Sequence, residues 1–239
     1  RVHWEGTTFN DSLQFAELND YEIKLSGSSF RSSPVIFHTE LIDRELIGAL
    51  TVKVKSSKSP DDKYYPKFES RDERLILKNV YPDMDFEGGV VVRGSRLDGT
   101  SVSGVPGYLK IYHEDTLFIR CAVDEILFQN DGFVASKAGM SIYLDEDSIH
   151  HPSIAVRYDR KTELVRFIRD EDGIGLQAFS DSYHKMDFQV EALTWKLSGK
   201  TIDLGPLLPT GRSVGIFRSQ SNFDKYTFDE MSAYASINP

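Results

Sequence analysis

Cysteine is nearly absent from this chain, because Cys121 is the only one among 239 residues. An internal disulfide is therefore impossible. Cys121 lies within the alternating run TLFIRCAV, and this alternation predicts a small residue in the core. A thiol nucleophile would need exposure and a neighbouring base, whereas free cysteine is among the most often buried residue types. We expect Cys121 to be a packed structural residue.

Long apolar runs are also absent. No stretch approaches the roughly 18 apolar residues that a membrane-spanning helix requires, so we expect no membrane span in this chain. The first residues, RVHWEGTTFN, lack the charged-then-apolar order of a signal peptide. The chain begins without methionine and stops at SINP, so we expect it to be a segment of a longer protein.

A basic excess and the common catalytic motifs are missing as well. Lysine and arginine number 28 against 37 acidic residues, which gives a formal charge of −9 and argues against a nucleic-acid partner or an anionic membrane. We find no serine nucleophile elbow, metal-protease helix or CxxC pair. These absences favour a protein that is not an enzyme, but all-β enzymes often scatter their catalytic residues, so the question stays open.

What the chain does contain is a regular series of short alternating runs, clearest over Ser141–Gly205. Connections of three or four residues join several pairs of these runs, namely 108–112 with 116–123, 154–158 with 163–168, and 188–197 with 201–204. Such connections are too short for a parallel crossover and predict antiparallel hairpins. We predict an all-β fold of stacked, mostly antiparallel short strands, jelly-roll-like or β-solenoid-like. The spacing of apolar residues over 223–235 predicts one short C-terminal helix.

The same patterns suggest how the chain divides. We expect residues 1–220 to form a single β-rich domain, and 221–239 to hold the short helix and the start of a linker. Two polar loops mark where a sub-boundary would fall, 56–63 and 98–107.

Glycine interrupts the valine-rich run FEGGVVVRGSRL at Gly88, Gly89 and Gly94. Glycine inside a strand indicates a bulge or a close approach of another backbone. A phosphate-binding loop would need a helix after these glycines, and the residues that follow cannot begin one. The pattern therefore excludes the usual nucleotide-binding motif.

Carboxylates and imidazoles gather in two places. Asp145 and Asp147 precede His150 and His151, so a carboxylate–histidine pair or a metal site is conceivable. Adjacent histidines in a strand point to opposite faces, however, and acidic residues are common in solvated turns. We favour a solvated turn over a site here.

The second gathering is an acidic loop. Asp170 and Asp172 lie in the fragment DEDG, and His184 follows further along the chain. The fragment resembles part of a calcium loop but lacks its alternate oxygen ligands and its later bidentate glutamate. We expect no cofactor and keep calcium as a weak alternative.

Aromatic residues leave a carbohydrate alternative open. Trp195 could stack on a sugar ring, but it lies in the alternating run ALTWKL, which favours a place in the core or on a sheet face. The many carboxylates could include a glycosidase pair, and the sequence cannot select one.

Several phrases resemble a family of very large, uncharacterised exported proteins of Bacteroidetes. They are HWEGTTF at 3–9, YPKFES at 65–70, DFEGGVVVRGSRLDG at 85–99, LDEDSIHHPSIAVRYD at 144–159, SYHKMD at 182–187 and MSAYASINP at 231–239. This resemblance covers nearly the whole chain. It implies an exported, multidomain cell-envelope protein, periplasmic or associated with the outer membrane, and it assigns no site residues.

A looser similarity of pattern concerns runs such as SIAVRYDRKTELVRFIRD. They resemble the strand–turn–strand units of the lipopolysaccharide-transport β-jellyroll, whose apolar interior shields acyl chains. The resemblance implies that a set of inward residues would line a groove: Ile154, Val156, Tyr158, Leu164, Phe188, Val190 and Leu197. The alternative is an ordinary closed core filled by the same residues.

Together these observations predict a non-enzymatic structural or binding module. Its partners would be other domains of the same long chain. A carbohydrate-active or carbohydrate-binding module and a lipid-groove module are the two alternatives.

Overall fold

The computed structural model describes residues 1–4, 14–21, 23, 27–40, 42, 44–53, 64–70, 74–169, 173–206 and 215–220. These residues are mostly β-strand, joined in one continuous antiparallel sheet. In chain order the strands are β1 (Val2–His3), β2 (Phe15–Leu18), β3 (Ser29–His38), β4 (Leu46–Lys53), β5 (Lys67–Ser70), β6 (Leu75–Tyr81), β7 (Met84–Arg93), β8 (Arg96–Thr100), β9 (Gly107–His113), β10 (Thr116–Val123), β11 (Glu125–Gln129), β12 (Gly132–Leu144), β13 (Asp147–Asp159), β14 (Leu164–Ile168), β15 (Phe179–Asp181), β16 (Met186–Gln189), β17 (Ala192–Lys196), β18 (Ile202–Gly205) and β19 (Ile216–Ser219).

This architecture confirms the predicted all-β class and the antiparallel stacking of strands. No α-helix occurs among the described residues, where the one multi-residue helical element is the 3-10 turn η3 (Gly173–Leu176). The predicted helix over 223–235 lies outside the described residues, as does the sub-boundary at 56–63. The other sub-boundary, 98–107, joins β8 to β9, and the predicted division into domains stays a prediction.

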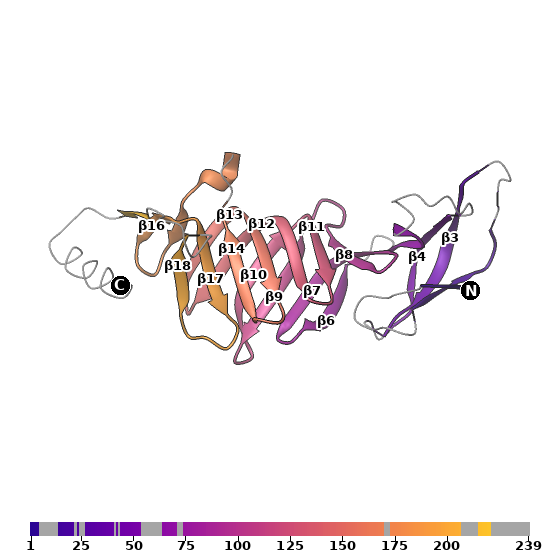
Figure 1. Ribbon diagram of the computed structural model, residues 1–239, viewed down its shortest axis with the longest axis horizontal. Helices are drawn as coiled ribbons and strands as arrows, with labels where there is room; N and C mark the ends of the chain where they lie inside the picture. Colours follow the sequence, from indigo (N-terminus) through magenta and orange to yellow (C-terminus); the bar gives the residue numbers. More distant parts are fainter. Residues whose placement is uncertain are drawn as a thin grey trace.

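Two hydrogen-bonded layers make up the part of the chain from β5 onward (Figure 1). We call layer A the series β6, β7 (84–88), β9, β10, β12 (138–144), β13 (147–151), β15, β16 and β19. Layer B is the series β5, β7 (89–93), β8, β11, β12 (132–135), β13 (154–159), β14, β17 and β18. The long strands β7, β12 and β13 belong to both layers, so each one bends from one layer into the other.

The chain passes between the layers along one edge, which we call the crossing edge. It comprises Gly88–Gly89, 101–106, Asp124, 136–137, 152–153, Arg169, 173–178 and 190–191. The registers align these points, since Gly89 pairs with Thr100 and Val123 pairs with both Gly107 and Ala138. The chain therefore advances in a zigzag, which produces the regular spacing of runs in the sequence.

Tight turns occupy the opposite edge, the hairpin edge. In layer A these are 82–83, 114–115, 145–146 and 182–185, and in layer B they are 94–95, 130–131, 160–163 and 197–201. Several turn residues have positive φ, including Asp83 (59°), Asp115 (63°) and Gly94 (56°). Such φ values suit glycine, asparagine and aspartate, so backbone geometry explains much of the acidic character of these loops.

The N-terminal strands extend the sheet beyond layer B. β4 pairs with β5, and β3, β2 and β1 follow in order, at the N-terminal end of Figure 1. Phe37 of β3 stacks on Phe68 of β5 with ring centroids 4.3 Å apart. The Trp4 ring contacts Phe37 and donates its indole N–H to the Pro66 carbonyl over 3.0 Å. These contacts join the N-terminal strands to the common core.

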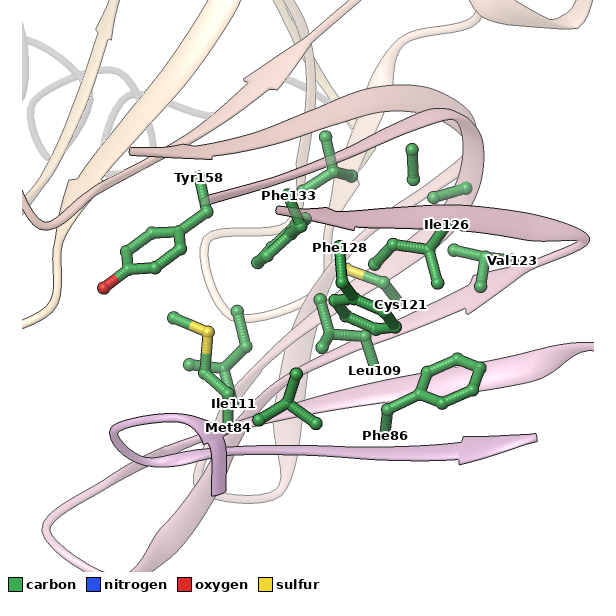
Figure 2. Close-up of a cluster of buried hydrophobic side chains, with 14 of the residues drawn as sticks. Met84, Phe86, Leu109, Ile111, Cys121, Val123, Ile126, Phe128, Phe133 and Tyr158 are labelled. Carbon is green, nitrogen blue, oxygen red and sulfur yellow. The ribbon is translucent and has the colours of Figure 1, made fainter. Parts of the chain in front are cut away.

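Side chains from the two layers meet in the interior (Figure 2). Phe86 of layer A contacts Phe128 of layer B with ring centroids 5.3 Å apart, and both are 0% exposed. Tyr81 of β6 contacts Tyr158 of β13 at 5.2 Å. The interior between these strands is therefore a packed core, stabilised by burial of apolar surface and by aromatic contacts.

Three backbones approach the Phe86 ring closely. A Cβ atom added at Gly88 would lie 2.6 Å from its Cζ, one at Gly107 would lie 2.8 Å away, and one at Gly99 would come nearer still. These glycines belong to β7, β8 and β9, so the ring is enclosed where the chain crosses between layers. A Cβ at Gly88 would also lie 2.8 Å from the Thr100 carbonyl oxygen of β8, which confirms the expected close approach of another backbone at Gly88.

Cys121 is fully buried in layer A, as predicted. Burial raises the pKa of its thiol to about 12. We therefore expect no reaction with an aromatic disulfide reagent at pH 8 in the native protein, and release of one equivalent of product after denaturation. Rapid stoichiometric labelling of the native protein would contradict this placement of the thiol.

Two sequence predictions need correction. Residues 98–100 are not loop, because β8 spans Arg96–Thr100 and pairs with both β7 and β11. The run 188–197 is not one strand, because the chain crosses between layers at Val190–Glu191 and separates β16 from β17. The hairpin β17–β18 itself is confirmed.

Candidate functional site

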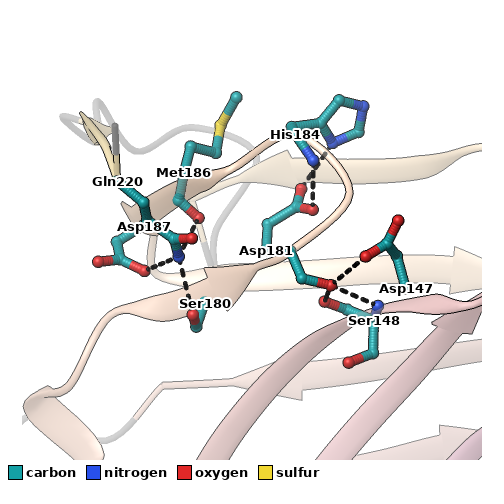
Figure 3. Close-up of polar contacts among 9 residues, drawn as sticks. Asp147, Ser148, Ser180, Asp181, His184, Met186, Asp187 and Gln220 are labelled. Atoms are coloured by element: carbon teal, nitrogen blue, oxygen red, sulfur yellow. Dashed lines mark hydrogen bonds and ion pairs between the residues drawn. The ribbon is translucent and has the colours of Figure 1, made fainter. Parts of the chain in front are cut away.

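Polar side chains gather where two hairpins of layer A lie side by side, the turn before β13 and the turn after β15 (Figure 3). The Ser182 hydroxyl donates to Asp147 Oδ1 over 2.8 Å and accepts the Ser148 N–H over 3.0 Å. The Ser182 N–H also donates to the Ser148 carbonyl over 3.1 Å. These bonds extend the β13–β15 ladder beyond its pair Ile149–Asp181, and thereby fix the two hairpins together.

A carboxylate–histidine pair lies beside them. Asp181 Oδ2 is 2.7 Å from His184 Nδ1, and Asp181 Oδ1 accepts the His184 N–H over 3.0 Å. Asp181 is only 3% exposed. An ionised carboxylate can only accept, so the imidazole hydrogen is on Nδ1. This is how a carboxylate orients a general-base histidine, but here the same carboxylate also closes the turn 182–185.

Gln220 connects the end of β19 to the neighbouring strands. Its side-chain Nε2 lies 2.6 Å from Asp187 Oδ1, 3.0 Å from Ser180 Oγ and 3.4 Å from the Met186 carbonyl. The amide hydrogens thus reach acceptors on β15 and β16. The polar side chains at this end of layer A therefore hydrogen-bond to neighbouring protein groups (Figure 3).

The adjacent histidines do point to opposite faces, as the strand geometry predicted. His150 is exposed on the outer side of layer A, with Nδ1 3.2 Å from Ser141 Oγ. His151 is 0% exposed and its ring contacts Phe179 at 4.8 Å. Burial lowers the pKa of His151. The two rings therefore cannot share a ligand.

The remaining acidic candidates do not converge. Asp145 occupies the two-residue turn between β12 and β13 with φ of 55°. Asp170 and Asp172 lie outside the described residues. Among the residues that the structure describes, no group of three or more His, Cys, Asp or Glu side chains could hold a metal ion.

Trp195 lies in the core. It is 1% exposed, donates its indole N–H to the Gly199 carbonyl over 3.0 Å and contacts Phe118 at 4.8 Å. Its ring faces other protein groups, so it offers no surface for a sugar.

A cluster of ion pairs around the buried Asp98 carboxylate on layer B was not predicted from the sequence. Asp98 is 0% exposed, with Oδ2 2.7 Å from Arg93 Nη1 and Oδ1 3.5 Å from Arg96 Nη2. Arg93 also lies 3.4 Å from Glu125. Burial raises the pKa of Asp98, and the two arginines oppose that rise. The available sequence signal for this cluster was the spacing of its arginines, since Arg93 and Arg96 flank the two-residue turn of the hairpin β7–β8.

Comparisons with protein-family models, curated proteins and solved structures found no match to this chain. In the described part of the chain, no helix is long and apolar enough to cross a membrane.

Proposed function

We propose that this chain is a non-enzymatic structural or binding module of a larger exported cell-envelope protein. The observation that supports it best is the packed interior. Phe86 contacts Phe128, and Tyr81 contacts Phe133, across the two layers, and the three phenylalanines are at most 1% exposed. These buried aromatic side chains thus stabilise the module itself.

The polar residues support the same proposal. Asp181 closes a turn, Ser182 links two hairpins, and Gln220 joins strands. Each of these roles is structural, and none requires a substrate. Export and attachment to further domains rest on the sequence resemblance alone, and fractionation of cells that make the full-length protein tests them. Recovery in the cytoplasm would exclude an envelope protein.

A lipid-groove module makes the opposite prediction about the interior. Of the residues that would line such a groove, Ile154, Val156 and Phe188 are at most 2% exposed. We expect native mass spectrometry of protein purified without detergent to give the mass of the polypeptide alone. A stoichiometric adduct with the mass of a lipid would overturn the proposal in favour of the lipid-groove alternative.

One observation favours the carbohydrate alternative. Tyr183 is 55% exposed at the tip of the turn 182–185, with its ring 4.7 Å from that of His184. Exposed aromatic rings beside polar groups suit sugar stacking. A glycan array with the native protein and Tyr183→Ala tests this. We expect no glycan signal, and a signal lost in the variant would establish carbohydrate binding at this turn.

A further inference from the structure

The outer side of layer A carries an arginine that stacks on a neighbouring aromatic ring. The Arg120 guanidinium of β10 lies over the Tyr108 ring of β9, with Cζ 3.9 Å from the ring centroid. Arg120 pairs with Lys110, so Tyr108 is its diagonal neighbour on the same face. A guanidinium stacked on an aromatic face keeps its N–H groups available to an acceptor in its own plane. The stacking therefore orients these N–H groups before any ligand binds.

The carboxylate beside Tyr108 is bonded to two other cations. Glu87 is opposite Tyr108, with Oε1 3.1 Å from Arg74 Nε and Oε2 2.9 Å from Lys110 Nζ. Within the described residues, Arg120 forms no ion pair with a carboxylate. Lys110 lies directly opposite Arg120, and like charges in this position are destabilising. An anion beside Arg120 would therefore be stabilised.

Two polar groups continue the row across the strands. Ser141 of β12 is opposite Arg120, and His150 of β13 is opposite Ser141. The Ser141 hydroxyl lies 3.2 Å from His150 Nδ1. When Nδ1 carries the hydrogen, it donates to the hydroxyl oxygen, and the hydroxyl hydrogen is available to a ligand. Opposite residues of antiparallel strands have Cβ atoms about 4.5–5.5 Å apart, so an oxyanion at Arg120 is within reach of Ser141.

Small residues lie beside Arg120 on the side of Tyr108. Ala122 is opposite Tyr108, and Gly139 is opposite Ala122. Among the described residues outside its chain neighbours, a Cβ added at Gly139 would meet two atoms within 4 Å, the Pro152 carbonyl oxygen at 3.3 Å and the Ala122 Cβ at 3.8 Å. The surface between the Arg120 guanidinium and β13 is therefore open to a ligand.

Aromatic and apolar residues lie on the other side of Arg120. Tyr112 is opposite Leu117, and Tyr143 follows Ser141 by two residues, so it shares the same face. Tyr112, Leu117 and Tyr143 are all partly exposed. Tyrosine and arginine are enriched where proteins bind proteins, and a central arginine among tyrosines is typical of the residues that contribute most to binding. These surroundings suit a carboxylate carried by a polypeptide.

We propose that Arg120 and Ser141 form a carboxylate-binding site on the outer side of layer A, and that its ligand is an aspartate or glutamate side chain of another polypeptide segment. The planar guanidinium matches the two oxygens of a carboxylate. The Ser141 hydroxyl supplies a further donor. The proposal does not depend on the proposed function, since neither the packed interior nor export requires this site.

NMR titration of the native protein with two matched peptides, acetyl-Leu-Glu-Leu-amide and acetyl-Leu-Gln-Leu-amide, tests the site. We expect the glutamate peptide to shift the Arg120 Nε–H and Ser141 amide signals in a saturable manner. The glutamine peptide should bind at least about tenfold more weakly, because it loses the charge-assisted hydrogen bonds. Acetate carries the carboxylate alone and should also bind more weakly than the glutamate peptide.

Three variants give matched controls. Arg120→Gln should weaken binding of the glutamate peptide about tenfold, and Arg120→Lys should weaken it because lysine keeps the charge but lacks the planar fork. Arg166→Gln removes an exposed arginine on the outer side of layer B and should bind like the wild type. The two peptides give the answer in the wild-type protein even if a variant fails to fold.

Four results would each overturn the site. They are equal affinity for the two peptides, unchanged affinity in a folded Arg120→Gln, acetate binding as tight as that of the glutamate peptide, and shifts at Arg166 as large as those at Arg120.

Discussion

Replacing Gly99 by alanine should destabilise the protein strongly. The new Cβ would overlap Cζ of the buried Phe86 ring, and it would lie 2.8 Å from Ile126 Cγ2. Phe86 cannot move away easily, because Gly88 and Gly107 hold backbone against the same ring. Overpacking of a filled core costs roughly 1–3 kcal/mol and sometimes more. We expect the free energy of unfolding from urea titration to fall by about 3 kcal/mol.

Gly205→Ala is the matched control. A Cβ at Gly205 in β18 meets nothing within 4 Å, so this variant should be as stable as the wild type or slightly more stable. In a double variant, Phe86→Leu should restore part of the stability lost in Gly99→Ala, since it removes the atoms that clash. Equal stability of Gly99→Ala and Gly205→Ala would show that Phe86 is not enclosed in this way.

Tyr81→Phe should have the second large effect. The Tyr81 hydroxyl lies 2.6 Å from the Gln129 carbonyl and 2.5 Å from the Gly132 carbonyl, and it accepts the Gln129 N–H over 3.2 Å. It thereby joins the β6–β7 hairpin of layer A to the β11–β12 hairpin of layer B. Removing it leaves buried backbone groups without their partner, at a cost of about 1–3 kcal/mol.

Tyr158→Phe provides the comparison for this prediction. Tyr158 belongs to the same aromatic cluster, where its ring contacts those of Tyr81 and Phe133, and it is 5% exposed. Its hydroxyl has no hydrogen bond within the described residues, so we expect a change within about 0.5 kcal/mol. If both tyrosines gave equal losses in thermal or chemical unfolding, the Tyr81 hydroxyl would not link the layers.

Burial of the Tyr81 hydroxyl also predicts that the stability of the protein falls at alkaline pH. Burial raises the pKa of this hydroxyl above the ordinary value. The folded state keeps a proton that the unfolded state releases above about pH 10, so stability is full below that pH and falls as the pH rises. Tyr81→Phe should weaken this dependence in urea titrations at pH 9 and 11.

Local pattern was sufficient for the class of fold. The hairpins β9–β10, β13–β14 and β17–β18 were predictable because each is formed by neighbouring runs with a short turn. The opposite directions of His150 and His151 and the core positions of Cys121 and Trp195 followed from the period of a strand. Each of these features depends on residues that are close in the chain.

Features that depend on distant residues were not predictable. β14 pairs with β17, and β13 pairs with β15, because the chain returns to each layer only after a crossing. At the crossing Val190–Glu191 the alternation continues to Ala192 and shifts phase only at Ala192–Leu193, so the pattern does not place the crossing at the residues where it occurs. Asp98 was assigned to a loop because its polar side chain interrupts the apolar pattern by which a strand is recognised. Its partner Arg93 lies across a hairpin.

In the candidate site too, features of single turns were predictable and contacts between distant turns were not. Asp147 and His184 were selected as polar turn residues, but only the pairing of β13 with β15 brings their hairpins together. Ser182, which bonds to Asp147, carried no signal of its own. Turn geometry accounts for Asp145, whose positive φ suits aspartate.

The central claim is that side chains of layer A and layer B pack against one another and fill the interior. Nuclear Overhauser contacts in protein purified without detergent test it directly. We predict cross-peaks between the rings of Phe86 and Phe128 and between those of Tyr81 and Tyr158, whose centroids are 5.3 and 5.2 Å apart. Absence of these cross-peaks, with contacts from the same rings to a bound non-protein molecule, would contradict the claim.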